Sequence, residues 1–297
     1  MQKIKNISRL TVIMLIIGIA ISFPQKIKAA EKKVYETLKD SKTYYYNLDQ
    51  KGKKESIKVT SLSKEYEENH QIYHDWNVTV TVNRKAIYNK KFERHRSDSP
   101  VKVMVTDVDK QDKQMELLII EGDSMYLDWV ADIKHIYYYQ YKTGKVKRKQ
   151  DLATIVKKGI PNIYNLHGMK KNAFLATNGN KEIYTKLCLK IPNFDYVHLK
   201  LKLALKNGKF VRPSAREYAL VDGMIMFTMK RNLTAYTKAG GKEKAFTIKK
   251  GEAVGPCRIY FSKNKKIYLK VKDKNGKTGY IDPQKASVAE QDGTNHV

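Results

Sequence analysis

The chain has 297 residues, of which 58 are Lys or Arg and 30 are Asp or Glu, so its formal net charge at pH 7 is +28. Two cysteines, Cys188 and Cys257, are too few for a small disulfide-rich scaffold, so that class is excluded. The positive balance predicts a long-range attraction to polyanions that weakens as the salt concentration rises.

The first 29 residues have the pattern of an export signal. Three basic residues precede an uncharged apolar run at 10–23, which is too short to span a bilayer comfortably. Ala29 supplies the small residue that a signal peptidase prefers at the cut, so we expect the mature chain to begin at Ala30. An uncleaved membrane anchor is the alternative.

Removal of the signal would leave the chain strongly cationic. The cut takes away five basic residues and no acidic one, which lowers the formal charge from +28 to +23. An exported cation meets anionic wall polymers first, so we expect a secreted or cell-wall associated protein that binds an anionic cell-wall polymer or peptidoglycan, and no nucleic acid. Membrane contact is expected only through the signal peptide. The alternative is a solvated basic surface that merely keeps the protein soluble.

Residues 30–220 alternate apolar and polar side chains in short runs, which predicts a mainly β region. The clearest turn is at Asn207 and Gly208, since both central positions of a two-residue hairpin turn need positive φ. Two short helices are also predicted, at 34–40 and at 151–158, where Asp151 can cap the first turn. Hairpins are predicted from four pairs of runs: 78–82 with 86–88, 101–105 with 117–120, 135–141 with 145–148, and 199–205 with 208–211.

Two loops in this region, 47–55 and 107–116, place acids or amides at alternate positions just before a strand. This pattern resembles the calcium-loop hairpins of the FG-GAP and VCBS families, which occur in extracellular β-propellers and surround a hard cation with oxygen atoms. The resemblance implies propeller-blade-like hairpins in an N-terminal β-sheet region, with a fainter third unit at 176–183.

Calcium is the one cofactor that this resemblance implies. Lys51 in the first loop would repel a cation, so we expect an ion only in the second loop. The alternative is that the acidic side chains simply accept backbone hydrogen bonds in a tight turn. The residues that would hold the ion are Asp107, Asp109, Gln111, Asp112 and Glu116.

Residues 222–284 carry a more specific pattern. An aromatic-Lys-Val strand at 267–271 is followed by an Asn-Gly turn and by a Gly-aromatic-aliphatic strand at 279–281. The order and spacing resemble a bacterial Src-homology-3-type domain, which implies a small C-terminal β-barrel that holds an exported protein on the cell wall. The usual opening of that family is replaced here at 233–241, where relatives form a ligand groove. A polar tail at 285–297 completes the chain as given.

A nucleophilic enzyme has weak support from the sequence. Cys188 with His198 is the candidate dyad, and Asn193 or Asp195 is the candidate orienting group. However, Cys188 lies in a strand-like run. A helix start would lower the pKa of its thiol, and Cys188 is not placed at one. A bridge between Cys188 and Cys257 and a pair of buried thiols are both open.

Two further catalytic patterns are incomplete. His70 and His74 are spaced to share a helix face, but the Glu that a zinc protease places between them is missing. Exposed histidines or a weak metal pair explain them equally well. Carboxylate pairs for sugar chemistry are often far apart along a chain, so the sequence does not locate one.

Tyrosines are frequent among the Lys-rich strands, and strand alternation places several on shared faces. An open face would form a glycan or peptide groove, whereas a covered face would be ordinary strand packing. We therefore expect a binding protein that adsorbs to wall polymers or glycans. One alternative is a peptidoglycan-processing hydrolase with scattered catalytic residues. The other is an adaptor that pairs its edge strands with a partner protein. The candidate binding residues are Tyr137, Tyr139 and Tyr141 on one strand and Tyr236, Tyr268 and Tyr280 in the C-terminal domain.

Overall fold

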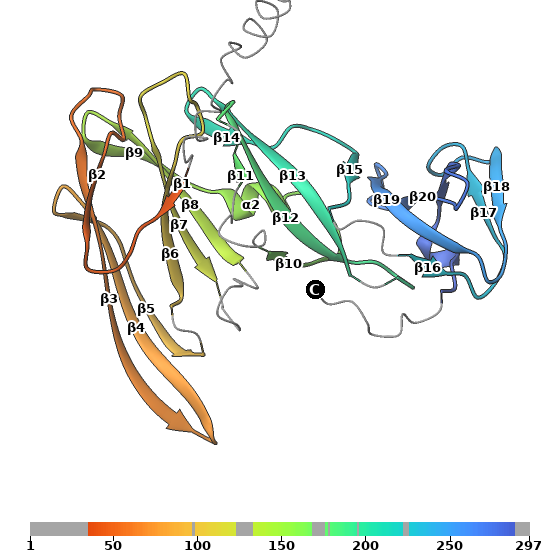
Figure 1. The fold of residues 1–297 in the computed structure, drawn as a ribbon, viewed down its shortest axis with the longest axis horizontal. Coiled ribbons are helices and arrows are strands. Elements are labelled where there is room, and N and C mark those ends of the chain that lie inside the picture. The colour runs from red at the N-terminus through yellow and green to blue at the C-terminus, as the bar shows by residue number, and fades with distance from the viewer. Residues whose placement is uncertain are drawn as a thin grey trace, which may run out of the picture. The chain divides into compact units, whose positions relative to one another are not determined.

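The structure is a computed structural model that divides into two compact units, Met1–Lys33 and Val34–Val297. It describes residues 35–96, 99–122, 133–167, 176–177, 179–194, 196–221 and 226–288, all within the second unit. The signal peptide with its cleavage site at Ala29 and Ala30 therefore lies outside the described residues, as does most of the polar tail. Over the described ranges the fold is mainly β, as predicted (Figure 1), and no helix there is long and apolar enough to cross a membrane.

The first sheet is an antiparallel meander of four strands in chain order. Asn83 and Arg84 form the turn between its last two strands, and both have the positive φ that a two-residue hairpin turn needs, which confirms this predicted hairpin. The longest pairing runs from Ile57 opposite Val82 to the far end of the hairpin. The strands are β2 (Thr43–Tyr46), β3 (Glu55–Glu68), β4 (Gln71–Val82) and β5 (Lys85–His95).

The second sheet has the strand order β1-β6-β7-β8-β9, and it contains two more of the predicted hairpins. Every residue of β7 is buried, because both faces of this sheet are covered. This explains why its sequence is a continuous apolar run without alternation. The strands are β1 (Tyr35–Thr37), β6 (Val101–Thr106), β7 (Glu116–Gly122), β8 (Ile133–Lys142) and β9 (Lys145–Asp151).

The helix predicted at 34–40 is wrong. Residues 35–37 instead form β1, which pairs with β6 from Tyr35 opposite Thr106 to Thr37 opposite Met104. The Leu38 side chain is then buried in the core between the first two sheets. A free strand edge that lies some seventy positions away in the sequence has overridden the local helical preference.

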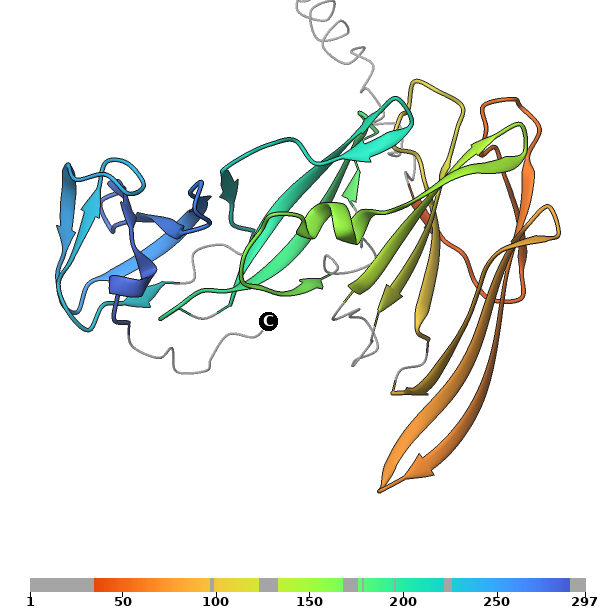
Figure 2. The ribbon, with the colours of Figure 1, turned by 180° about the vertical axis from the view of Figure 1, so that it is seen from behind.

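The helix predicted at 151–158 is confirmed as α2 (Leu152–Lys157). Asp151 is its N-cap and accepts a hydrogen bond from the Ala153 N–H. Leu152, Ala153 and Val156 are buried, so the helix uses one face to cover the second sheet. In Figure 2 it is the green coiled segment that follows directly from β9.

The third sheet is again antiparallel, in the order β10-β12-β13-β14, with β11 also paired to β12. Asn207 and Gly208 both have positive φ and join β13 to β14, which confirms the fourth predicted hairpin. The strands are β10 (Ile163–His167), β11 (Ala176–Thr177), β12 (Glu182–Lys190), β13 (Tyr196–Lys206) and β14 (Lys209–Val211).

The C-terminal sheet has the open order β15-β19-β20-β21-β17-β18, with β16 paired to β19. None of the sheets in the described part of the chain closes into a barrel. Because β15 pairs with β19, residues 217–219 belong to this sheet, so its first strand lies before the predicted boundary at 222. The elements are β15 (Glu217–Ala219), β16 (Phe227–Thr228), β17 (Leu233–Tyr236), β18 (Lys244–Ile248), β19 (Ala253–Phe261), β20 (Ile267–Lys272), β21 (Thr278–Ile281) and the 3-10 turn η1 (Pro283–Lys285).

Two hydrophobic cores hold these sheets. The smaller core lies between the first and second sheets, where Val80 and Tyr88 meet Ile119 and Tyr139. The larger core contains the other face of the second sheet, α2, the third sheet and the inner face of the C-terminal sheet. The β-rich region and the C-terminal sheet therefore share one apolar core instead of being joined only by a linker.

Candidate functional site

The loop predicted to bind calcium is held by bonds within the protein. The Asp109 carboxylate lies 3.1 Å from Lys181 Nζ, and Asp112 accepts a hydrogen bond from Gln50. Glu116 accepts a hydrogen bond from the Val108 N–H, and burial raises its pKa to about 8, so at neutral pH it is mostly a neutral acid. Asp107 is buried, whereas Gln111 is exposed.

No group of three or more His, Cys, Asp or Glu side chains in the described ranges is placed to hold a metal ion. In the observed geometry the acidic side chains accept backbone hydrogen bonds within tight turns. The N–H of Gln111 binds the Asp109 carboxylate, and the N–H of Gln114 binds the Asp112 carboxylate, as in Asx-type turns.

The two acidic loops nevertheless have equivalent structures. In the first loop the Leu48 N–H donates to Glu55 at 2.8 Å, and in the second the Val108 N–H donates to Glu116 at 2.9 Å. Both apolar residues are fully buried, and both glutamates open the following strand. Loops 47–55 and 107–116 therefore share this hydrogen bond from the buried apolar residue to the glutamate.

Main-chain hydrogen bonds also connect the loops to one another. The Met115 N–H donates to Asn47 O, which links the second loop to the first. The Lys110 N–H donates to Gly179 O, and the Lys181 N–H donates to Val108 O, which links the third unit to the second. The three loops are thus connected by main-chain hydrogen bonds.

The cysteine and histidine candidates do not assemble into a catalytic site. Cys188 and Cys257 are both free thiols, so no bridge joins them. Cys188 does lie directly opposite His198 on β13, but it is buried in the sheet. Asn193 donates its amide hydrogens to the carbonyls of Pro283 and Gln284, and Asp195 lies outside the described residues.

His70 and His74 are on a β-hairpin and not on a helix. His70 is fully exposed in the turn at the tip between β3 and β4. His74 lies on β4, where its ring packs against Trp76 and its Nδ1 is 3.9 Å from Glu65. Their spacing therefore does not create a shared metal site.

Tyr137, Tyr139 and Tyr141 share one face of β8, as alternation predicted, but this face is covered. Tyr139 and Tyr141 are buried in the core between the first and second sheets, and the Tyr139 hydroxyl donates to Ile87 O. Tyr137 is half-buried at the rim of that core. Only this last tyrosine is placed to contact solvent, so the three do not form an open groove.

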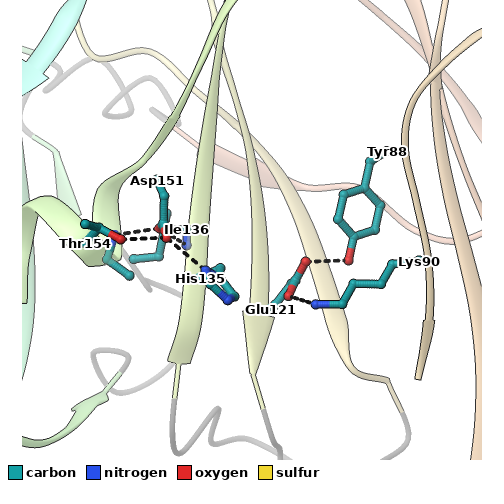
Figure 3. Close-up of polar contacts among 8 residues, drawn as sticks. Tyr88, Lys90, Glu121, His135, Ile136, Asp151 and Thr154 are labelled. Carbon is teal, nitrogen blue, oxygen red and sulfur yellow. Dashed lines mark hydrogen bonds and ion pairs between the residues drawn. The ribbon is translucent and has the colours of Figure 1, made fainter. Parts of the chain in front are cut away.

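A group of polar residues lies at this rim, and the sequence did not reveal it. Figure 3 shows the contacts of Glu121 with Tyr88 and Lys90 and those of Asp151 with His135 and Thr154. Glu121 is almost completely buried, accepts a hydrogen bond from the Tyr88 hydroxyl at 2.8 Å and lies 2.5 Å from Lys90 Nζ. Glu121 is also directly opposite His135, whose ring stacks on Tyr137. We call these residues the rim cluster: Tyr88, Lys90, Glu121, His135, Tyr137, Lys149, Asp151 and Thr154.

Asp151 organises the second half of the rim cluster. One carboxylate oxygen lies 2.8 Å from His135 Nδ1 and accepts from the Thr154 hydroxyl, while the other accepts from the Ile136 and Ala153 N–H groups. Burial alone would raise the pKa of Asp151, but the hydrogen bonds from His135, Ile136 and Thr154 outweigh it and hold this pKa below its usual value.

The tyrosines of the rim cluster remain protonated at neutral pH. Burial, together with the negative charge of Glu121, raises the pKa of Tyr137 to about 12 and raises the pKa of Tyr88 still further. Lys149 Nζ lies over the Tyr137 ring, 3.7 Å from its centroid, and contributes a cation–π contact.

The chemistry that the rim cluster can perform follows from these contacts. An Asp that orients a His is one half of a hydrolytic triad, and the other half is a nucleophile at the second ring nitrogen. In the described part of the chain His135 contacts Asp151 and Tyr137, and the Thr154 hydroxyl donates to Asp151. The cluster thus lies as a polar group at the end of the core between the first two sheets.

The C-terminal sheet presents a second aromatic surface, on the face opposite its core. Tyr260 lies directly opposite Tyr268, and Tyr280 lies directly opposite Tyr236. The ring centroid of Tyr260 lies 6.4 Å from that of Tyr268 and 6.4 Å from that of Tyr280. All four tyrosines are half-buried. The structure thus brings Tyr236, Tyr268 and Tyr280 together as predicted, and it adds Tyr260 between them.

Charged residues on the same face complete what we call the tyrosine face. Lys270 lies opposite Tyr280 with its Nζ 5.4 Å from the ring centroid, and Arg258 lies opposite Lys270. Glu217 accepts a hydrogen bond from the Tyr280 hydroxyl and pairs with Arg258. Burial, and then the charge of Glu217, raises the pKa of Tyr280. The tyrosine face consists of Tyr236, Tyr260, Tyr268, Tyr280, Glu217, Arg258 and Lys270.

The replaced family opening at 233–241 lies against the tyrosine face. Gly240 has a φ of +71°, and a Cβ at this position would lie 3.1 Å from the Tyr268 hydroxyl. A larger residue would therefore press on the Tyr268 hydroxyl as well as straining the turn. Residues 233–241 are thus part of this surface.

Known proteins give no match. Comparison of the chain with family models, with curated proteins and with solved structures found none that resembles it significantly. The two family resemblances in the sequence therefore remain expectations.

The functional residues that the sequence missed are those whose neighbours come from distant strands. Glu121, His135 and Asp151 come from β7, β8 and β9, and Tyr88 comes from another sheet. The available signals were Asp151 at a predicted helix start and the polar Glu121 at the end of an apolar run. Tyr260 was detectable as a tyrosine that alternates with buried Ile259 on β19.

Proposed function

We propose that this protein is a secreted, cationic, cell-envelope-associated binding protein whose tyrosine face contacts an anionic wall polymer or glycan. The observation that carries the proposal is the grouping of four half-buried tyrosines with Arg258 and Lys270 on one face of the C-terminal sheet. Tyrosine rings stack on sugar rings, and the guanidinium and ammonium groups pair with anionic substituents of the polymer.

Charge gives this binding its range. The formal net charge of +28 before signal removal draws a polyanion toward the protein from a distance, and this attraction weakens with salt. Ring stacking is not screened by salt. The proposal therefore separates a salt-sensitive adsorption step from salt-resistant recognition by the tyrosine face. The Src-homology-3-like order of the C-terminal strands supports the same wall-targeting role.

The test is co-sedimentation of residues 30–297 with cell-wall sacculi, with and without their anionic polymers, at low and at high salt. Replacement of Tyr260 and Tyr268 by Ala should weaken salt-resistant binding by about tenfold or more, because two stacking contacts are lost. The matched control is Tyr45→Ala, since Tyr45 is 61% exposed on the first sheet and should leave binding unchanged.

Three outcomes would decide the matter. Salt-resistant binding that falls in the Tyr260 and Tyr268 variant but not in the Tyr45 variant supports the tyrosine face. Binding that disappears at high salt in the unaltered protein reduces the function to electrostatic adsorption. No sedimentation with the sacculi under any condition refutes the wall-binding function.

A further inference from the structure

The far half of β3 has an unpaired edge in the described part of the chain. β2 covers one side of β3 only from Glu55 to Lys58, and the Asp40 side chain reaches the Ser61 N–H. β4 continues along the other side to Glu68. Figures 1 and 2 both show the ends of β3 and β4 extending past β2. Residues 62–68 therefore offer main-chain groups to another strand.

This free edge is acidic in a strongly basic protein. Residues 62–68 contain Glu65, Glu67 and Glu68 against a single Lys64. Both Glu65 and Glu67 are exposed, and their contacts are with His74 and His70 at 3.7 Å or more. Leu62 and Ile72 add exposed apolar surface beside them.

A second free edge of equal length has the opposite charge. β9 ends the second sheet, and its seven residues contain Lys145, Lys147, Arg148 and Lys149 against a single Asp151. Lys145 and Lys147 are exposed, as is Val146 between them. β5 is another basic edge, but its charges are more widely spaced and two β-bulges interrupt its pairing with β4.

We infer that the partner of the β3 edge is the β9 edge of a second copy of this chain. Lysines on an edge strand normally prevent pairing between like edges, and here they exclude β9 against β9. The glutamates exclude β3 against β3 for the same reason. The combination that remains is β3 against β9, which joins a four-stranded sheet of one copy to a five-stranded sheet of the next.

Such a contact is heterologous, because it uses two different surfaces of each copy. A contact of this kind leaves one free acidic edge and one free basic edge on every assembly, so copies add in a row unless the rotation closes a ring. On a polymer surface a row of copies would multiply weak contacts. The assembly itself, however, is independent of the proposed ligand and is measured without it.

The experiment uses sedimentation velocity on residues 30–297, which include the whole second compact unit. The unaltered protein should increase in mass with concentration at low salt and return to a monomer at high salt. Glu65→Lys with Glu67→Lys removes the acidic edge, and Lys145→Glu with Lys147→Glu removes the basic edge. Each double variant alone should be a monomer.

The decisive sample is an equimolar mixture of these two variants. The unchanged basic β9 edge of the first variant faces the unchanged acidic β3 edge of the second, and the reversed β3 and β9 edges are again opposite in charge, so the mixture should assemble like the unaltered protein. Lys263→Glu with Lys265→Glu is the charge-matched control, because both residues are exposed in a C-terminal turn, and this variant should assemble like the unaltered protein. A monomeric unaltered protein, a mixture that stays monomeric, or assembly that survives either edge variant alone would overturn the proposal.

Discussion

The tyrosines of β8 and those of the C-terminal sheet occupy alternate positions in similar Lys-rich strands, but they have different environments. Tyr139 and Tyr141 are sealed between two sheets, whereas Tyr260 and Tyr268 line a surface with no sheet above it in the described residues. The comparison shows that strand alternation selects which side chains share a face. Tertiary packing then decides whether that face is buried or exposed.

The strongest test of this contrast compares Tyr139→Ala with Tyr268→Ala. Loss of the buried Tyr139 ring should lower the free energy of unfolding by about 3–5 kcal/mol, because the covering sheet leaves a cavity. Loss of the half-exposed Tyr268 ring should cost about 1 kcal/mol or less. Urea denaturation of both variants measures the difference, and equal losses would mean that the two faces are packed alike.

Glu116 tests the burial of the covered region by its pH dependence, because its carboxylic acid is buried there. Its pKa of about 8 lies above that of an unfolded Glu, so the native state holds the proton more tightly. The free energy of unfolding should therefore fall as pH rises from about 5 to 8, by about 3 kcal/mol for this group. Glu116→Gln keeps an acceptor for the Val108 N–H and should remove this pH dependence. A variant curve parallel to that of the unaltered protein would contradict the burial effect.

A matched pair of hydroxyl deletions tests the same contrast at smaller scale. Tyr88→Phe removes a buried hydrogen bond to Glu121 and should cost about 1.5–3 kcal/mol. Tyr280→Phe removes a partly exposed hydrogen bond to Glu217 and should cost about 0.5 kcal/mol. Thermal or urea unfolding of the two single variants measures both, and a larger loss for Tyr280 would reverse the assignment of buried and exposed faces.

The smallest expected effect concerns Asp151 at the edge of the covered region. Asn at this position still caps α2 but loses the charge that faces His135, so it should cost about 1 kcal/mol at neutral pH. The pKa of Asp151 is lowered in the native state, so its contribution is present above about pH 4 and is lost as pH falls below that value. Unfolding curves for Asp151→Asn should converge with those of the unaltered protein in acid, and a difference that persists there would show that charge is not the cause.

Local signals in the sequence predicted the parts of the fold that depend on neighbouring residues. Asn83 with Arg84 and Asn207 with Gly208 form turns whose positive φ values are a property of a few residues. Asp151 capped the predicted helix for the same reason. In contrast, residues 35–37 became a strand because β6 offers an edge, and no local window contains that information.

The same distinction explains what was found of the candidate site. Tyr268 and Tyr280 could be grouped because β20 and β21 follow each other closely in sequence, whereas Tyr236 was grouped with them through the resemblance of the whole domain, since β18, β19 and β20 separate β17 from β21. The rim cluster could not be predicted, since Lys90 and Glu121 come from sheets whose packing is decided by the apolar core between them. The covering of β8 by the first sheet was hidden for the same reason.

The links between the three loops have a consequence for how this chain can diverge. Met115 to Asn47, Lys110 to Gly179 and Lys181 to Val108 are joined through main-chain N–H and carbonyl groups, which every residue except proline can supply. Substitution of loop side chains that make no other bond therefore leaves these links between the loops intact. The connection between the three loops would then persist while the rest of their sequence diverges.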